Sequence, residues 1–290
     1  MNIQRKLISV QTPAKQQGFM GRGHIARPVI QKPFSESDPF IFLMDDLLNK
    51  QDEEPAGGPH PHAGFETVSL LLEGEFGESS FKMKEGDFQI MTAGSGIVHT
   101  ETIDKKSKMR LLQMWLNLPK KARWTTPRVQ NLPRAHVQTL SEHGLEIKVY
   151  SGMFAGLKSP VRNHVPVIVA DIQMQPGLET VQEIPAAFNT FLYVLEGGIM
   201  IGEEQNFLLQ DQVGWLDRPS DDGASKLKLT AGNSGAHFVL YSGQTQGEPI
   251  ISQGPFIGDT QNDIKRLYKE YREGKMQHIS TVPEKQQITW

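Results

Sequence analysis

The sequence of 290 residues predicts an all-β protein of two stacked domains, and three observations support this prediction. Glycine and proline are plentiful, with 27 and 18 copies, which is typical of short strands joined by many turns. The apolar segments are short and end at glycine turns, so they fit a β-sandwich or barrel better than long helices. Related segments also recur in the two halves of the chain, which indicates two copies of one structural unit.

Composition excludes several classes of protein. The chain has no cysteine, so disulfides, thiolate nucleophiles, iron–sulfur clusters and sulfur-ligated zinc are excluded. The formal net charge of −3 argues against direct nucleic-acid binding, which usually needs a strongly basic face. We find no apolar segment of signal length near the amino terminus and no stretch of about 18 apolar residues, so the sequence predicts a cytoplasmic protein without membrane contact.

Two short motifs predict a metal site: His60-Pro61-His62 and, 37 positions after its second histidine, His99-Thr100-Glu101. Residues i and i+2 of an extended strand point to the same face, so each motif can direct two side chains at one point. Three imidazoles and one carboxylate suit Fe(II), Mn(II), Ni(II), Co(II) or Zn(II) better than Ca²⁺ or Mg²⁺.

The internal repeat relates residues 64–74 to residues 187–197 at a constant offset of 123. A second pair, residues 85–91 and 209–215, follows at an offset of 124. Each copy is predicted to form a strand, a Glu-Gly turn, a short strand, a Gly/Asp turn and another strand.

The repeat also predicts which half holds the metal. The positions equivalent to the four candidate ligands are Glu183, Pro185, Gly223 and Ser225, and three of these have no side chain that binds metal well. We therefore expect an N-terminal metal-binding domain, residues 1–140, and a C-terminal domain without metal, residues 141–290.

An amphipathic helix is predicted over residues 259–274, within the C-terminal domain. Thr260 and Asp263 resemble a capping box, and Gly274 is placed to end the helix. Its apolar residues follow the i, i+3, i+4, i+7 spacing of a helix face that packs on a sheet: Ile264, Leu267, Tyr268 and Tyr271.

The chain resembles the pirin family of the cupin superfamily, and the similarity covers most of its length. The most specific match is the sixteen-residue segment from Gly86 to Glu101. The other matching segments are His60-Pro61-His62 with Gly64-Phe65-Glu66-Thr67, Leu72-Glu73-Gly74-Glu75, residues 113–119, Gly247-Glu248-Pro249, and Gly254-Pro255-Phe256 with the helix after it.

The resemblance implies a bicupin, with two face-to-face antiparallel β-barrel or jelly-roll domains and a C-terminal helix. It implies one iron ion in the amino-terminal cupin, with His60, His62, His99 and Glu101 as ligands. Generic cupins take their carboxylate from the position of Glu66 instead. The pirin pattern leaves Glu66 as a partner that orients a ligand imidazole, or as a structural residue of the repeated strand.

The resemblance further implies an Fe(II)-dependent quercetin 2,3-dioxygenase, although other divalent transition metals suit the same ligands. Its substrates would be a phenolic compound, such as a flavonol, and O₂, with Glu101 as the candidate catalytic base for the flavonol 3-hydroxyl. The alternative is a non-catalytic, iron-dependent redox-sensing regulator that binds protein partners. Action on another small enol or phenol is a third reading, because a fold does not fix a substrate.

Two positions depart from the family pattern. Gly57 stands where many members have phenylalanine, and Ala63 stands where many have arginine or lysine. Both changes predict a wider and less basic entrance to the metal.

Phe65, Met114 and Trp115 are expected in the core, and Met91 and Ile97 flank the ligand-bearing turn as candidate cavity residues. Isolated histidines are expected to be surface or hydrogen-bonded residues: His24, His136, His143, His164, His237 and His278.

Overall fold

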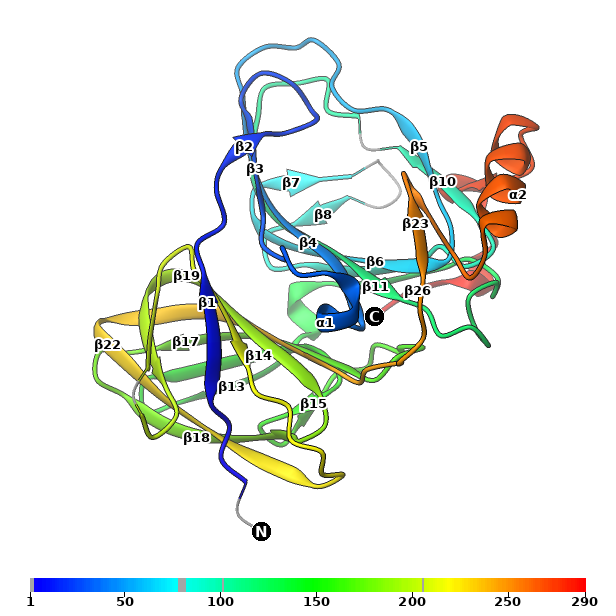
Figure 1. The fold of residues 1–290 in the computed structure, drawn as a ribbon. Helices are drawn as coiled ribbons and strands as arrows, with labels where there is room; N and C mark the ends of the chain where they lie inside the picture. Colours follow the sequence, from blue (N-terminus) through cyan, green and yellow to red (C-terminus); the bar gives the residue numbers. More distant parts are fainter. Residues whose placement is uncertain (1–2, 78–81, 101, 205) are drawn as a thin grey trace. The chain divides into compact units, whose positions relative to one another are not determined.

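The computed structural model describes residues 3–77, 82–100, 102–204 and 206–290. Its strands dominate and it contains one long helix near the carboxyl end, which confirms the predicted all-β class with a C-terminal helix (Figure 1). No helix among the described residues combines the length and the hydrophobicity that crossing a membrane requires.

The chain divides into two compact units. Unit 1 contains Met1–Pro13, Ser37–Pro39 and Val137–Gln246, and unit 2 contains Ala14–Glu36, Phe40–His136 and Gly247–Trp290. These ranges differ from the expected 1–140 and 141–290 at both ends of the chain. The first thirteen residues belong with the second repeat, and the C-terminal helix belongs with the first.

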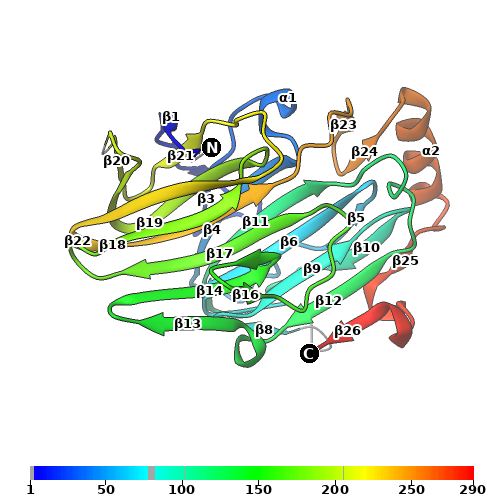
Figure 2. The ribbon, with the colours of Figure 1, turned by 90° about the horizontal axis from the view of Figure 1, so that it is seen from below.

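Unit 1 is built on a nine-stranded antiparallel sheet in the order β1-β21-β19-β22-β17-β14-β13, with β18 paired to β22 and β20 paired to β19. Figure 2 shows β13, β14 and β17 side by side at one edge. The strands of unit 1 are β1 (Leu7–Gln11), β13 (Gln138–Glu142), β14 (Leu145–Ser151), β15 (Met153–Phe154), β16 (Leu157–Lys158), β17 (Val167–Met174), β18 (Glu179–Pro185), β19 (Asn189–Ile201), β20 (Asn206–Leu209), β21 (Val213–Leu216) and β22 (Ala224–Gly243).

Unit 2 contains an eight-stranded sheet in the order β2-β3-β4-β11-β6-β9-β12-β26 and a three-stranded sheet in the order β25-β10-β5. Figure 1 shows β5 beside β10. The helices are α1 (Phe34–Ser37) and α2 (Gln261–Arg272). The strands are β2 (Gln16–Gln17), β3 (His24–Pro28), β4 (Phe40–Lys50), β5 (Pro59–His62), β6 (Phe65–Glu73), β7 (Glu75–Phe76), β8 (Met83–Lys84), β9 (Phe88–Thr92), β10 (Ile97–Thr100), β11 (Ser107–Asn117), β12 (Arg128–Leu132), β23 (Ile251–Gln253), β24 (Phe256–Gly258), β25 (Gln277–His278) and β26 (Gln287–Thr289).

The internal repeat appears in the structure as the same strand pairing in both units. β6 pairs antiparallel with β9 in unit 2, and β19 pairs antiparallel with β21 in unit 1. Side chains alternate across these sheets, so Ile147 and Val149 enter the core of unit 1 while Glu146 and Lys148 face outward. The repeat therefore encodes the same antiparallel strand pair in both units.

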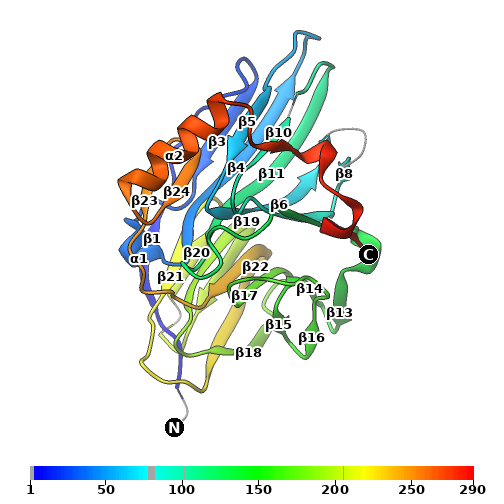
Figure 3. The same ribbon diagram turned by 90° about the vertical axis from the view of Figure 1, so that its right-hand side faces the viewer.

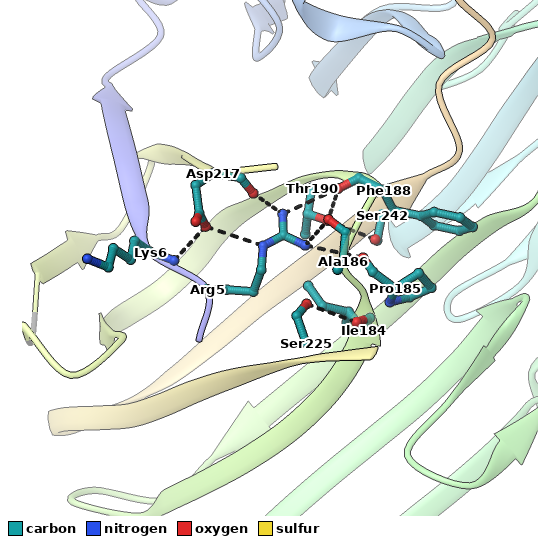
Figure 4. Close-up of polar contacts among 10 residues, drawn as sticks. All are labelled: Arg5, Lys6, Ile184, Pro185, Ala186, Phe188, Thr190, Asp217, Ser225 and Ser242. Atoms are coloured by element: carbon teal, nitrogen blue, oxygen red, sulfur yellow. Dashed lines mark hydrogen bonds and ion pairs between the residues drawn. The ribbon is translucent and has the colours of Figure 1, made fainter. Parts of the chain in front are cut away.

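Arg5 anchors the amino-terminal segment in unit 1 (Figure 4). Its fully buried guanidinium donates to the carbonyl oxygens of Pro185, Ala186 and Phe188 at 3.3–3.4 Å. It also donates to the carboxylate of Asp217 at 3.3 Å and to the carbonyl of the same residue. Burial lowers the pKa of Arg5, and the nearby Asp217 carboxylate opposes that shift. These contacts tie the segment before β1 to the second repeat.

Helix α2 begins and ends as the sequence predicts. The Thr260 hydroxyl accepts from the backbone N–H of Asp263 at 3.2 Å, and the Asp263 carboxylate accepts from the N–H of Thr260 at 2.8 Å. Gly274 has a φ of +66°, the left-handed conformation that ends many helices. Figure 3 shows α2 alongside β23 and β24, and its buried Ile264 and Leu267 pack there.

Candidate metal centre

Strands β5 and β10 bring three of the predicted ligands to one point. They pair antiparallel, with His60 opposite His99 and His62 opposite Ile97. The Nε2 atom of His99 lies 2.8 Å from Nε2 of His60 and 3.0 Å from Nε2 of His62. Among the described residues this is the one group of three or more ligand-type side chains whose donor atoms all lie within 4.8 Å of one another.

The spacing of these nitrogens fits a single transition-metal ion. Imidazole nitrogens bind such ions at about 2.1 Å, so two ligands at right angles are separated by roughly 3.0 Å. The observed separations of 2.8 and 3.0 Å are close to that value. Three histidines on one face of an octahedron leave positions for a carboxylate and for smaller ligands.

The hydrogen bonds of His60 prepare it as a ligand. Its Nδ1 lies 2.8 Å from the carbonyl oxygen of Gly58. A carbonyl oxygen only accepts, so Nδ1 carries the proton and the Nε2 lone pair faces the other two imidazoles.

His62 is held in its neutral form. Its pKa is well below the usual value because burial penalises the charged ring, and His99 and His60 add to this effect. The carbonyl of Pro255 acts in the opposite direction, although the Nδ1 atom of His62 makes no hydrogen bond of acceptable geometry within the part of the chain that the structure describes. A neutral imidazole is the form that binds metal.

The lowered pKa of His62 predicts that acid destabilises the metal-free protein. A histidine in the unfolded chain has a pKa of about 6.5, so as the pH falls below that value the unfolded state takes up this proton first. The free energy of unfolding therefore falls until the pH passes the lower, folded pKa. In chelator, the wild type is expected to lose more stability between about pH 7.5 and about pH 5.5 than His62→Gln, as measured by urea denaturation. Equal losses in the two proteins would contradict this assignment.

Of the two candidate carboxylate ligands, Glu101 and Glu66, the structure describes only Glu66. Glu101 lies outside the described residues, so its role as fourth ligand and catalytic base stays a prediction. Glu66 is fully buried on β6, where its Oε1 accepts from the hydroxyl of Thr92 at 2.6 Å. Glu66 is not in the group formed by the three histidines. These contacts therefore favour a structural role for Glu66 within the repeated strand.

A cavity of about 570 Å³ lies beside His60 and His62. Its other lining residues are Phe19, Phe42, Gly57, Gly58, Pro59, Gln113 and Trp115. Gly57 contributes no side chain to this wall, and the wider entrance stays a prediction. The indole ring of Trp115 meets the ring of His62 at a centroid distance of 5.3 Å and an angle of 71°.

Several predicted positions of side chains are wrong. Trp115 was expected in the core, but it is half-buried and lines the cavity. Ala63 was expected at the entrance, but it is fully buried among Phe256, Ile264 and Leu267. The two candidate cavity residues, Met91 and Ile97, instead pack in a core cluster with Val129, Ile279 and Val282. Phe65 and Met114 are buried as expected.

Phe19 and Phe42 are cavity residues that the sequence did not reveal. Phe42 is directly opposite Trp115 in the pairing of β4 with β11, so the register of that pair identifies it. Phe19 lies on a glycine-rich loop, where no periodic pattern indicates which way a side chain faces.

A larger polar cavity of about 790 Å³ is lined by residues of unit 1, whereas the three histidines belong to unit 2. Its lining includes His237, whose Nε2 is 2.8 Å from the carboxylate of Asp171. His237 is thus hydrogen-bonded, as expected for an isolated histidine. We place the candidate chemistry in unit 2, because the described metal-ligand group lies there.

Comparison with known proteins agrees with these features. The pattern of the pirin family matches residues 22–116, and the pattern of the pirin C-terminal cupin domain matches residues 169–277. A pirin-like protein 2 of Arabidopsis thaliana is 32% identical over 281 residues, which cover 87% of this chain and 86% of that protein. Human pirin is 31% identical over 279 residues, with 93% of each chain covered.

The fold also matches solved structures. A quercetin 2,3-dioxygenase from Acinetobacter baumannii superposes with a TM-score of 0.83 at 26% identity. The superposition covers 94% of this chain and 98% of that enzyme. The similarity therefore extends over both units.

Proposed function

The chain belongs to the pirin family of bicupins, and we propose that it is a metal-dependent dioxygenase that opens the heterocyclic ring of a flavonol. The single observation that carries this proposal is the group of three histidines with a cavity of about 570 Å³ beside it. Cavities of roughly 300–1,000 Å³ are typical of small-molecule sites. The 26% identical quercetin 2,3-dioxygenase supports the choice of substrate class.

The donor set suits iron(II), although the histidines alone do not distinguish it from other divalent transition metals. Iron held by His60, His62, His99 and the candidate ligand Glu101 would supply open coordination positions and redox chemistry with O₂. The neutral state of His62 and the Nδ1–H bond of His60 keep both rings ready to bind.

The cavity wall suits a planar phenolic substrate. Trp115 and Phe42 pack edge to face with ring centroids 5.3 Å apart, and both border the cavity. Aromatic rings of a flavonol can stack on these side chains or meet their edges. The amide of Gln113 adds a polar group that can orient a phenolic hydroxyl.

The overall reaction conserves atoms. A base, for which Glu101 is our candidate, takes the proton of the 3-hydroxyl. The carbon that bears this oxygen is released as carbon monoxide when its two ring bonds break. Both atoms of O₂ form bonds to the two ring carbons left behind, and the other product is a depside.

Addition of quercetin to the iron(II)-loaded protein without oxygen is expected to shift the flavonol absorption band. Admission of air is then expected to bleach the band, with uptake of O₂ and release of carbon monoxide. The matched control is the same experiment without iron, in the presence of chelator. Absence of O₂ uptake by protein with full iron occupancy would overturn the dioxygenase proposal and favour the redox-sensing regulator.

A further inference from the structure

We propose that Phe19 is a specificity-determining residue of the cavity, where its ring covers a planar aromatic ligand, and that the buried His24–Asp46 pair positions it. This inference rests on the proposed function for the class of ligand. The role of Phe19 concerns ligand binding rather than turnover, so it can be tested separately from the proposed dioxygenase activity.

Phe19 is unusual among the large aromatic residues of unit 2. Its side chain is 67% exposed, whereas Phe65 and Phe88 are almost fully buried. The exposed ring nevertheless borders the same cavity as Phe42 and Trp115. A ligand that covers this ring removes apolar surface from water, and such burial favours binding.

The loop that carries Phe19 is held in place by three backbone hydrogen bonds, two of which involve His24. The N–H of Gly18 donates to the carbonyl of His24 at 2.9 Å, and the N–H of His24 donates to the carbonyl of Gly21 at 3.2 Å. The N–H of Asn49 donates to the carbonyl of Gly23 at 2.8 Å, which ties the loop to β4. The position of Phe19 is thus preorganised, which reduces the entropy cost of ligand binding.

The imidazole of His24 contacts this loop at Met20 and Phe19. Its Nδ1 accepts from the N–H of Met20 at 3.1 Å, so its Nε2 carries the proton and donates to the Asp46 carboxylate at 2.8 Å. Both side chains are buried, with exposures of 0% and 5%. The rings of His24 and Phe19 meet at a centroid distance of 5.4 Å and an angle of 74°. His24 is therefore a positioning residue for Phe19.

The tight fit at Gly18 supports the same conclusion. A Cβ atom at that position would lie 2.3 Å from the ring of His24, so the loop accepts no side chain there. On the wall formed by Gly57 and Gly58 the situation is opposite, because a Cβ atom at Gly58 would meet nothing within 4 Å. Aromatic contact in this cavity is therefore concentrated on Phe19, Phe42 and Trp115.

The test is calorimetric titration of the iron(II)-loaded protein with quercetin in the absence of oxygen. Phe19→Ala is expected to raise the Kd about tenfold, the size of effect expected for one aromatic contact with its buried area. Phe19→Trp should retain wild-type affinity, and the iron content of every variant should match the wild type. The matched control is Phe207→Ala, which removes an exposed ring of unit 1 that does not border this cavity.

A second variant tests the positioning role. His24→Gln keeps a polar side chain but alters the support of Phe19, so its Kd should rise, and the further loss on adding Phe19→Ala should be smaller than in the wild-type background. An unchanged Kd for Phe19→Ala, or no quercetin binding by the wild type, would overturn the proposal. An unchanged Kd for His24→Gln would overturn its positioning part. Tight binding without O₂ uptake would instead overturn the proposed function and leave the role of Phe19 standing.

Discussion

The His99→Ala protein is expected to bind no iron under conditions in which the wild type binds one ion per chain. The Nε2 atom of His99 lies within 3.0 Å of Nε2 of both His60 and His62. Loss of a residue that only supports a ligand typically weakens metal binding 10–100-fold, so loss of His99 itself should exceed about 100-fold. Metal analysis after equilibration with limiting iron(II) measures this effect.

The His237→Ala protein is the matched control for that experiment. His237 also bonds to a neighbouring side chain, but it lies in unit 1. Its iron content and O₂ uptake should equal those of the wild type. Circular dichroism checks that His99→Ala retains its strands. Wild-type iron stoichiometry in folded His99→Ala would remove His99 from the ligand set.

Arg123→Met is expected to destabilise the protein by roughly 3 kcal/mol, because it removes one partner of a buried charged network. The fully buried guanidinium donates to the carbonyl of Gly64 and the side chain of Asn117, both at 3.0 Å. It also donates to the carboxylate of Asp259 at 2.8 Å. Methionine fills much of the space but leaves all three acceptors without this donor.

The same change should loosen the metal centre. Gly64 follows His62 by two residues, so Arg123 fixes the segment that carries two of the three histidines. We expect iron affinity to fall about tenfold, the loss typical of residues that support ligands. Urea denaturation in chelator measures the stability, and competition with a chromophoric chelator measures the affinity.

Arg134→Met is the control for Arg123→Met. The Arg134 side chain is 60% exposed and lies 3.8 Å from an equally exposed Glu85. Such exposed pairs contribute little, so both measurements should stay at wild-type values. Equal urea midpoints for Arg123→Met and the wild type would show that the buried network does not stabilise unit 2.

Features that depend on nearby residues were predictable from the sequence. His60 and His62 are two residues apart on β5, and His99 lies on β10, the strand that pairs with it. Strand geometry and the repeat were therefore enough to group the three histidines. Helix α2 was predicted because its cap, its apolar face and its terminal glycine all lie within sixteen residues.

Features that depend on distant residues were not predictable. Strands with both faces covered show no clear alternation, so the pattern around Trp115 did not reveal which face borders a cavity. The environment of Ala63 is set by α2, about 200 residues later in the chain. Arg123 gave no signal because its partners Gly64 and Asp259 are 59 and 136 positions away.

The first thirteen residues belong to unit 1 and residues 247–290 belong to unit 2, and this arrangement has a consequence for biosynthesis. Unit 1 is formed by residues up to Gln246. Unit 2 also needs two later strands: β25 pairs with β10, which carries His99, and β26 pairs with β12. Domains commonly fold as they emerge from the ribosome. Here the unit formed mostly by later residues has all of its segments first, whereas β10 and β12 of the other unit gain their partners β25 and β26 only after Gln277 and Gln287 have been added.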